Sequence, residues 1–195
     1  MVTVAFIMLI GALFAVPAFM TLGMAPHAAL FEAMSGITTT GHSVAADAQN
    51  WPFAAHFLRA WLQWCGGLVM ATAVLALLLP AGVPTQRLGR AGIDQGDRIA
   101  STRVQARQLL SVYLSLTVIM TIPTMLIIPD WREGFVLTLS AISTGGFAPR
   151  PDSLASYSAA GQGIVMLTCV LGSVSLLTFV LLGQKKPVDA WWLGS

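Results

Sequence analysis

The sequence predicts an all-α membrane protein with two tandem repeats, each with a long helix, a short helix, a Thr/Gly-rich segment and a second long helix. The composition and the spacing of the apolar stretches lead to this prediction. Of the 195 residues, 56% are hydrophobic and only 9% are charged, whereas soluble domains carry about 25% charged residues. So few charges cannot cover a soluble globule, and a chain this apolar does not stay disordered. The net charge of +2 is too small to indicate a nucleic-acid partner.

Four apolar stretches are long enough to cross a bilayer, whose hydrocarbon core requires about 20 residues of helix. They are residues 2–23, 53–79, 109–128 and 161–183. A signal peptide is the alternative for the first stretch. However, no basic residue precedes its long apolar run and no A-x-A cleavage site follows it, so we interpret it as a spanning helix.

Two further apolar stretches, residues 27–37 and 131–142, are too short to span a bilayer. Stretches of this length are more often buried or re-entrant helices than spans. Each one lies between two spanning stretches, and each ends in a cluster of Thr, Ser and Gly residues. The same order of segments therefore occurs twice along the chain.

An internal repeat relates the two clusters, because a shift of 105 residues places residues 35–42 on residues 140–147. Chance is the alternative, since small residues are common in membrane helices, but the order of the flanking segments matches as well. Tandem repeats in membrane proteins commonly place a ligand or ion site between their units. The identical pairs are Ser35 and Ser140, Ile37 and Ile142, Thr39 and Thr144, Gly41 and Gly146, and Asp47 and Asp152.

Basic residues predict the orientation and the boundaries of the repeats. The segment between the second and third spans contains Arg87, Arg90, Arg98, Arg103 and Arg107, and Lys185 and Lys186 follow the fourth span. The positive-inside rule places both segments in the cytoplasm, so both Thr/Gly clusters are expected to face outside. The predicted division is a first repeat at 1–82, a cytoplasmic linker at 83–108, a second repeat at 109–187 and a C-terminal tail at 188–195.

Irregular backbone such as residues 38–42 is costly at membrane depth unless it is buried in protein or lines a water-filled cavity. Extended backbone can point successive carbonyl oxygens at a dehydrated cation, and glycine reaches the backbone angles that this requires. Oxygen ligands without a carboxylate suit an alkali ion better than a transition metal. The C-terminal end of a short helix, with its partial negative charge, also favours a cation.

Three motifs resemble those of the Trk/Ktr/HKT superfamily of potassium transporters. Residues 31–41, FEAMSGITTTG, resemble the first pore loop of this family. Residues 62–67, LQWCGG, are similar to the L-Q-W-x-G-G that opens the following helix in Trk members. Residues 143–147, with Asp152 and Ser153 behind them, resemble the second pore loop. The resemblance extends over nearly the whole chain.

This resemblance implies two helix–pore loop–helix repeats, with four transmembrane helices and two re-entrant pore helices, in a bacterial inner-membrane K⁺ uptake protein that is not an enzyme. Family filters keep mainly one glycine per repeat, and these glycines map to Gly41 and Gly146. Glycine at both positions favours K⁺ over Na⁺. The implied ion filter consists of Thr38, Thr39, Thr40, Gly41, Ser143, Thr144, Gly145 and Gly146.

The family likeness also bears on partners. It implies no cofactor besides the transported K⁺, and it implies a cytoplasmic nucleotide-binding ring protein as a regulatory subunit. Family members carry four repeats, whereas this sequence has two, and half a ring would expose filter carbonyls to lipid. We expect a second copy or a missing half to close the pore, with a truncated reading frame preferred. A non-conducting truncated or assembly subunit is the alternative function.

Several polar residues are predicted near the pore. The predicted mouth consists of Glu32, His42, Asp47, Phe147 and Asp152. Glu32 either attracts cations or holds the pore helix by hydrogen bonding. Asp47 and Asp152 either raise the local cation concentration or cap their loops. His42 either tunes the mouth when protonated or is simply exposed there.

The remaining candidates are given structural roles. Arg59 is expected to snorkel outward or to pair with Asp47 or a pore-helix carbonyl. Asp130 and Glu133 form a predicted capping pair for the second short helix. Cys65 and Cys169 lie in apolar runs without metal-ligand spacing, so we interpret both as small packing residues.

Overall fold

The computed structural model describes the backbone of residues 2–78 and 95–174, and the side chains of residues 2–74 and 106–174. This part of the chain is all-helical and contains no strand, as the sequence predicted. The elements are α1 (Val2–Met20), α2 (Pro26–Ile37), the 3₁₀ helix η1 (Ala48–Asn50), α3 (Phe53–Leu78), α4 (Gln95–Ile127), α5 (Trp131–Ile142) and α6 (Ala159–Ser173).

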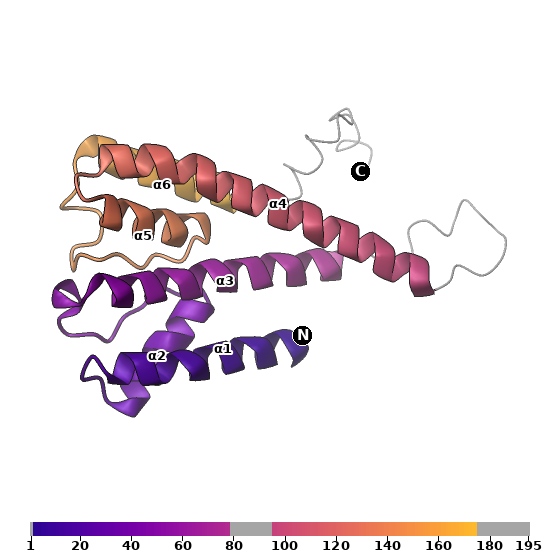
Figure 1. Ribbon diagram of the computed structural model, residues 1–195, viewed down its shortest axis with the longest axis horizontal. Coiled ribbons are helices and arrows are strands. Elements are labelled where there is room, and N and C mark those ends of the chain that lie inside the picture. Colours follow the sequence, from indigo (N-terminus) through magenta and orange to yellow (C-terminus); the bar gives the residue numbers. More distant parts are fainter. Residues whose placement is uncertain (1, 79–94, 175–195) are drawn as a thin grey trace, which may run out of the picture.

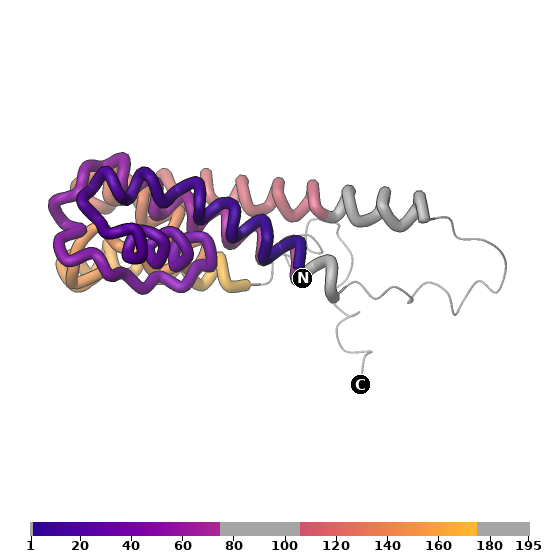
Figure 2. Tube along the Cα trace, turned by 90° about the horizontal axis from the view of Figure 1, so that it is seen from below, coloured from indigo at the N-terminus to yellow at the C-terminus, as the bar shows by residue number. Residues whose placement is uncertain are grey.

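The helices form two groups of three that lie side by side (Figure 1). Within the first group, α1, α2 and α3 contact one another, and within the second group α4, α5 and α6 do the same. Helix α3 also contacts α4 and α5, so it joins the two groups. The segments that follow α2 and α5 lie at the same end of the molecule, as the second view also shows (Figure 2).

The shift found in the sequence also relates the two short helices. Helices α2 and α5 are each 12 residues long, and both their first and their last residues are 105 positions apart. The long helices that follow begin at Phe53 and Ala159, so the connection in the second group is one residue longer. The apolar spacing and the Thr/Gly clusters therefore predicted two equivalent short helices, the first within one residue and the second at its observed bounds.

Two helices of the described chain are long and apolar enough to cross a membrane, over Val2–Met20 and Ala106–Ile127. Helix α3 has 26 residues, and the described part of the fourth predicted span is the 15-residue α6. Helix α4 begins at Gln95, so the second half of the predicted linker is helical. The linker residues 83–94, the lysines 185 and 186 and the tail 188–195 lie outside the described residues.

The C-terminal end of each short helix lies directly against a glycine of the long helix that follows it. A Cβ atom added to Gly66 of α3 would lie 1.9 Å from the carbonyl oxygen of Ile37, the last residue of α2. A Cβ atom added to Gly172 of α6 would lie 2.3 Å from the carbonyl oxygen of Ile142 in the same way. Small residues of this kind let membrane helices approach closely.

We therefore predict that Gly66→Ala and Gly172→Ala destabilise the protein by about 1–3 kcal/mol each, because a methyl group forces the helices apart. Thermal unfolding in detergent, followed by size-exclusion chromatography, measures the effect. Gly163→Ala on α6 is the matched control, since nothing lies within 4 Å of its Cβ position. Equal stability of all three variants would contradict this packing role.

Candidate functional site

The two Thr/Gly clusters form loops with the same backbone conformation, which we call the first loop (residues 38–42) and the second loop (residues 143–147). Thr39 has a φ of 55° and Thr144 a φ of 53°, and two positions later Gly41 and Gly146 have φ values of 76° and 83°. A left-handed conformation costs a residue with a Cβ atom about 1–2 kcal/mol. Both threonines are thus held in place by their surroundings.

Each loop folds back over the end of its short helix. The Thr40 N–H donates to the Ser35 carbonyl (3.0 Å), and the equivalent Gly145 N–H donates to the Ser140 carbonyl (2.8 Å). In the first loop, the N–H groups of residues 38, 39 and 41 also donate to carbonyls of α2. Because these donors are used internally, the polar groups left for a ligand are oxygen atoms.

The two loops touch one another, although they are about a hundred residues apart in sequence. A Cβ atom on Gly41 would lie 2.0 Å from the Gly145 carbonyl oxygen and 3.3 Å from the Gly146 Cα atom. Gly41 therefore needs to be glycine for two reasons, its backbone angle and this contact. The structure brings together the two clusters that the sequence singled out.

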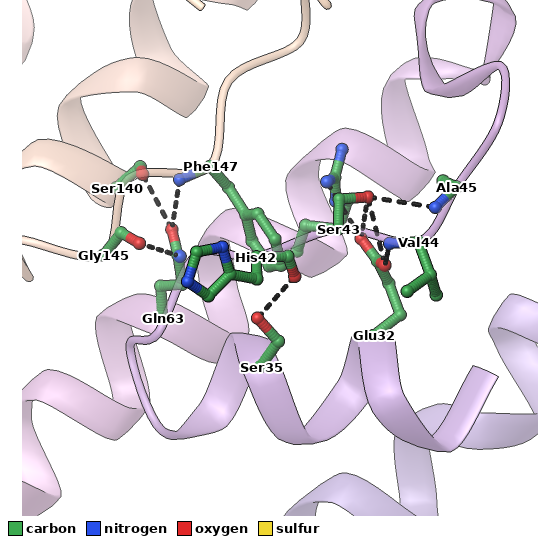
Figure 3. A network of polar contacts seen from close by, with 11 residues as sticks. Glu32, Ser35, His42, Ser43, Val44, Ala45, Gln63, Ser140, Gly145 and Phe147 are labelled. Atoms are coloured by element: carbon green, nitrogen blue, oxygen red, sulfur yellow. Dashed lines mark hydrogen bonds and ion pairs between the residues drawn. The ribbon is translucent and has the colours of Figure 1, made fainter. Parts of the chain in front are cut away.

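Gln63 of α3 connects the first group to the second loop (Figure 3). Its side chain is fully buried. The amide Nε2 donates to the Gly145 carbonyl (2.6 Å), and Oε1 accepts from the Ser140 hydroxyl (2.7 Å) and the Phe147 N–H (3.3 Å). The Gly145 carbonyl, a candidate filter oxygen, is therefore hydrogen-bonded inside the protein.

A buried ion pair lies behind the first loop. The Glu32 carboxylate is fully buried and lies 2.8 Å from Nη2 of Arg59. It also accepts from the Ser43 hydroxyl (2.9 Å) and the Val44 N–H (3.2 Å), just past the first loop. Glu32 was expected to attract cations or to hold the pore helix by hydrogen bonding; it is instead buried, and its hydrogen bonds connect α2 to the segment that follows the first loop.

Arg59 joins the two groups as well. Its guanidinium lies 4.1 Å from the centre of the Phe147 ring and 5.4 Å from that of Trp51. Its ion-pair partner is Glu32 and not Asp47, which corrects one of the alternatives expected from the sequence. Phe147, predicted at the mouth, is buried with 3% of its surface exposed, because its ring covers Arg59.

The other predicted mouth residues are exposed. Asp47 accepts from the Asn50 amide (2.7 Å) and lines a cavity of about 350 Å³ with Gly41 and Gly146. Asp152 accepts from the Ser156 hydroxyl and lines a neighbouring cavity. His42 accepts a hydrogen bond from the Ser35 hydroxyl through its backbone carbonyl (2.5 Å).

The start of α5 differs in part from the predicted capping pair. Asp130 caps the helix by accepting from the Arg132 N–H (2.9 Å). Glu133 instead pairs with Arg150 (3.0 Å) and accepts from the Tyr157 hydroxyl (2.8 Å), so it holds the connection between α5 and α6. Burial and this hydrogen bond raise the pKa of Tyr157, which keeps its hydroxyl protonated as a donor.

The motif at residues 62–67 contains Gln63 but does not indicate its role, and the sequence predicted only capping for Glu133. The position of the polar Gln63 in an apolar helix is the feature that could have indicated a role, because a buried amide needs hydrogen-bond partners. Cys65 and Cys169 are free thiols, half-buried against apolar neighbours. Within the described ranges, no three His, Cys, Asp or Glu side chains come together as a metal site.

We predict that Arg59→Gln destabilises the protein by about 3–5 kcal/mol, because it leaves the Glu32 carboxylate buried without a counter-charge. The Glu32→Gln/Arg59→Gln double variant should lose less, since no unpaired charge remains. Thermal unfolding in detergent measures both. Arg132→Gln, at an exposed site, is the control, and an Arg59→Gln effect as small as that of Arg132→Gln would refute the prediction.

Comparisons with known proteins agree with this fold. Residues 2–182 match the family TrkH, described as a cation transport protein. The Trk system potassium uptake protein TrkH of Halomonas elongata is 28% identical over 81% of this chain and 33% of its own length. TrkH of Vibrio parahaemolyticus is 31% identical over 78% of this chain and 32% of its own length.

The fold has a counterpart among solved structures. The crystal structure of the potassium transporter TrkH from Vibrio parahaemolyticus matches with a TM-score of 0.61 and 29% identity, over 76% of this chain and 29% of that one. The chain spans about a third of the length of the curated relatives it matches. The family resemblance inferred from the residues is confirmed: the chain belongs to the TrkH family of cation transport proteins, which are transporters and not enzymes.

Proposed function

We propose that the chain supplies two units of a K⁺ uptake pore whose ion path is lined by oxygens of the two loops. The contact between Gly41 and the Gly145–Gly146 backbone is the observation that carries this proposal. The proposed filter residues are Thr38, Thr39, Thr40, Gly41, Ser143, Thr144 and Gly146, with Gly145 in a supporting position.

The electrostatics of the loops support a cation as the ligand. Helices α2 and α5 end at Ile37 and Ile142, directly before the loops, so their partial negative charges face the proposed path. Glu32, the carboxylate beneath the first loop, is neutralised by Arg59. Neutral oxygens without a free carboxylate suit a monovalent cation that exchanges quickly.

The proposed membrane arrangement follows from the helices. Helices α1, α3, α4 and α6 cross the bilayer, whereas α2 and α5 are re-entrant pore helices of the repeats at 1–82 and 109–187. The segments that follow α2 and α5 run to the same end of the molecule, which supports a common outer face. Basic residues put the linker and the C-terminus on the cytoplasmic side, where a nucleotide-binding ring subunit would dock.

Two further units are needed to close the proposed pore. Large apolar side chains are exposed on the outer helices, among them Phe14 of α1 (83%), Leu126 of α4 (81%) and Met166 of α6 (62%). These faces fit lipid or further helices. The units come from a second copy of this chain or from additional sequence, and a chain that conducts nothing by itself would be an assembly subunit.

Expression in a bacterium that lacks its own K⁺ uptake tests this function. We expect growth at low K⁺ and Rb⁺ uptake above the empty vector. Gly41→Ser should abolish both, because its side chain meets the Gly145 carbonyl. Gly146→Ser has open space at its Cβ position and adds only backbone strain, so it should mainly weaken the preference for K⁺ over Na⁺.

Gly163→Ser on α6 is the control for these glycine variants, since its Cβ position is open and its φ is not positive. Absence of Rb⁺ uptake by a protein that reaches the membrane, alone and with further units supplied, would refute conduction. Normal uptake and selectivity in both loop variants would refute the assignment of the filter.

The orientation is testable with single cysteines in a Cys65→Ala/Cys169→Ala background. We predict that His42→Cys and Asp152→Cys react with an impermeant maleimide added outside intact cells, because both sites are exposed in the outer loops. Arg107→Cys should react only after the membrane is opened. Labelling of the loop sites and of Arg107→Cys from the same side would contradict the proposed topology.

A further inference from the structure

Gln63 belongs to the first group of helices, but all of its described hydrogen bonds go to the second. Its Nε2 bonds the Gly145 carbonyl at 2.6 Å, and its Oε1 takes two donors from Ser140 and Phe147. These three partners come from α5 and the second loop, 77 to 84 residues further along the chain. An unpaired buried amide costs about 1–3 kcal/mol, so this side chain and the loop stabilise each other's position.

The amide of Gln63 also accounts for a difference between the two loops. The first loop reads Thr-Thr-Thr-Gly and the second Ser-Thr-Gly-Gly, so Gly145 is equivalent to Thr40. The φ of Gly145 is not positive. A Cβ atom at Gly145 would, however, lie 2.3 Å from Cδ of Gln63 and 2.6 Å from both of its polar atoms. The neighbouring amide, and not the backbone angle, therefore requires glycine there.

The first loop has no such amide in the part of the chain that the structure describes. Thr40 is exposed, and its hydroxyl shares a hydrogen bond with that of Thr38 (2.8 Å). The one-residue offset of the second long helix makes Cys169 of α6 equivalent to Gln63 of α3. A thiol cannot form this three-bond contact. The contact that Gln63 makes with the second loop is therefore not repeated by the equivalent residue of the second repeat.

We infer that Gln63 is a positioning residue for the second loop, which fixes its backbone and withdraws the Gly145 carbonyl from the ion path. The two loops of this chain then present unequal sets of carbonyl oxygens, with Thr40 contributing in the first and Gly145 not contributing in the second. This inference rests on the proposed function, because it assigns ion ligands.

Transport by the complete protein encoded by the gene provides the first test. Gln63→Leu should lower the preference for Rb⁺ over Na⁺ by about tenfold, the size expected when a buried hydrogen bond to a site is lost. Gln63→Glu should do so as well, because a carboxylate replaces the donor to Gly145 with an acceptor. Thr72→Val is the matched control on the same helix, since its hydroxyl bonds the Val69 carbonyl of that helix (2.8 Å).

Stability provides a second test that does not need transport. Gly145→Ala should lower the midpoint of thermal unfolding in detergent by at least about 2–4 °C, through its clash with the amide. In a Gln63→Ala background the same change should cost much less, because the clash is gone. Additive shifts in this cycle would overturn the contact itself.

The two tests separate the possible failures. If wild-type protein conducts no ion but the stability changes are coupled, the proposed function fails and the contact between Gln63 and Gly145 stands. If wild-type protein takes up Rb⁺ while Gln63→Leu and Gln63→Glu keep the selectivity of Thr72→Val, the positioning role is overturned.

Discussion

The structure depends on satisfying the polar groups of irregular backbone inside an apolar protein. Residues 38–42 and 143–147 do not continue the helices, and irregular backbone is costly at membrane depth unless its polar groups find partners. The loop N–H groups therefore donate to the last carbonyls of α2 and α5. The same hydrogen bonds therefore stabilise the fold at the ends of the short helices and the loops of the candidate site.

Helix α3 unites the two repeats because it carries the side chains that reach both loops. Arg59 pairs with Glu32 behind the first loop and stacks on Phe147 of the second. One turn further along, Gln63 binds the backbone around Gly145. Buried contacts of α3 thus connect the two loops to one another.

Sequence patterns predicted the helices of the fold and the two segments that form the candidate site. Apolar lengths and the 105-residue shift predicted α2 and α5, and the Thr/Gly clusters predicted where the chain becomes irregular. These signals are local, so they can be recognised in the sequence without knowledge of how the helices pack. Glu32 was not among the partners expected for Arg59, and Phe147 was expected at an exposed mouth. Both outcomes depend on which side chains meet in the folded protein, and the local sequence does not specify this.

The sequence by itself determined the helical class, the repeat and the family, since hydropathy, glycine positions and short motifs are properties of consecutive residues. Only the tertiary structure decided that Glu32 is neutralised in the interior and that Gly145 is bonded by Gln63. The physical reason is distance along the chain, which no local pattern bridges. Glu32 and Arg59 meet through the packing of α2 against α3, and Gln63 meets Gly145, 82 positions away, through the packing of α3 against α5.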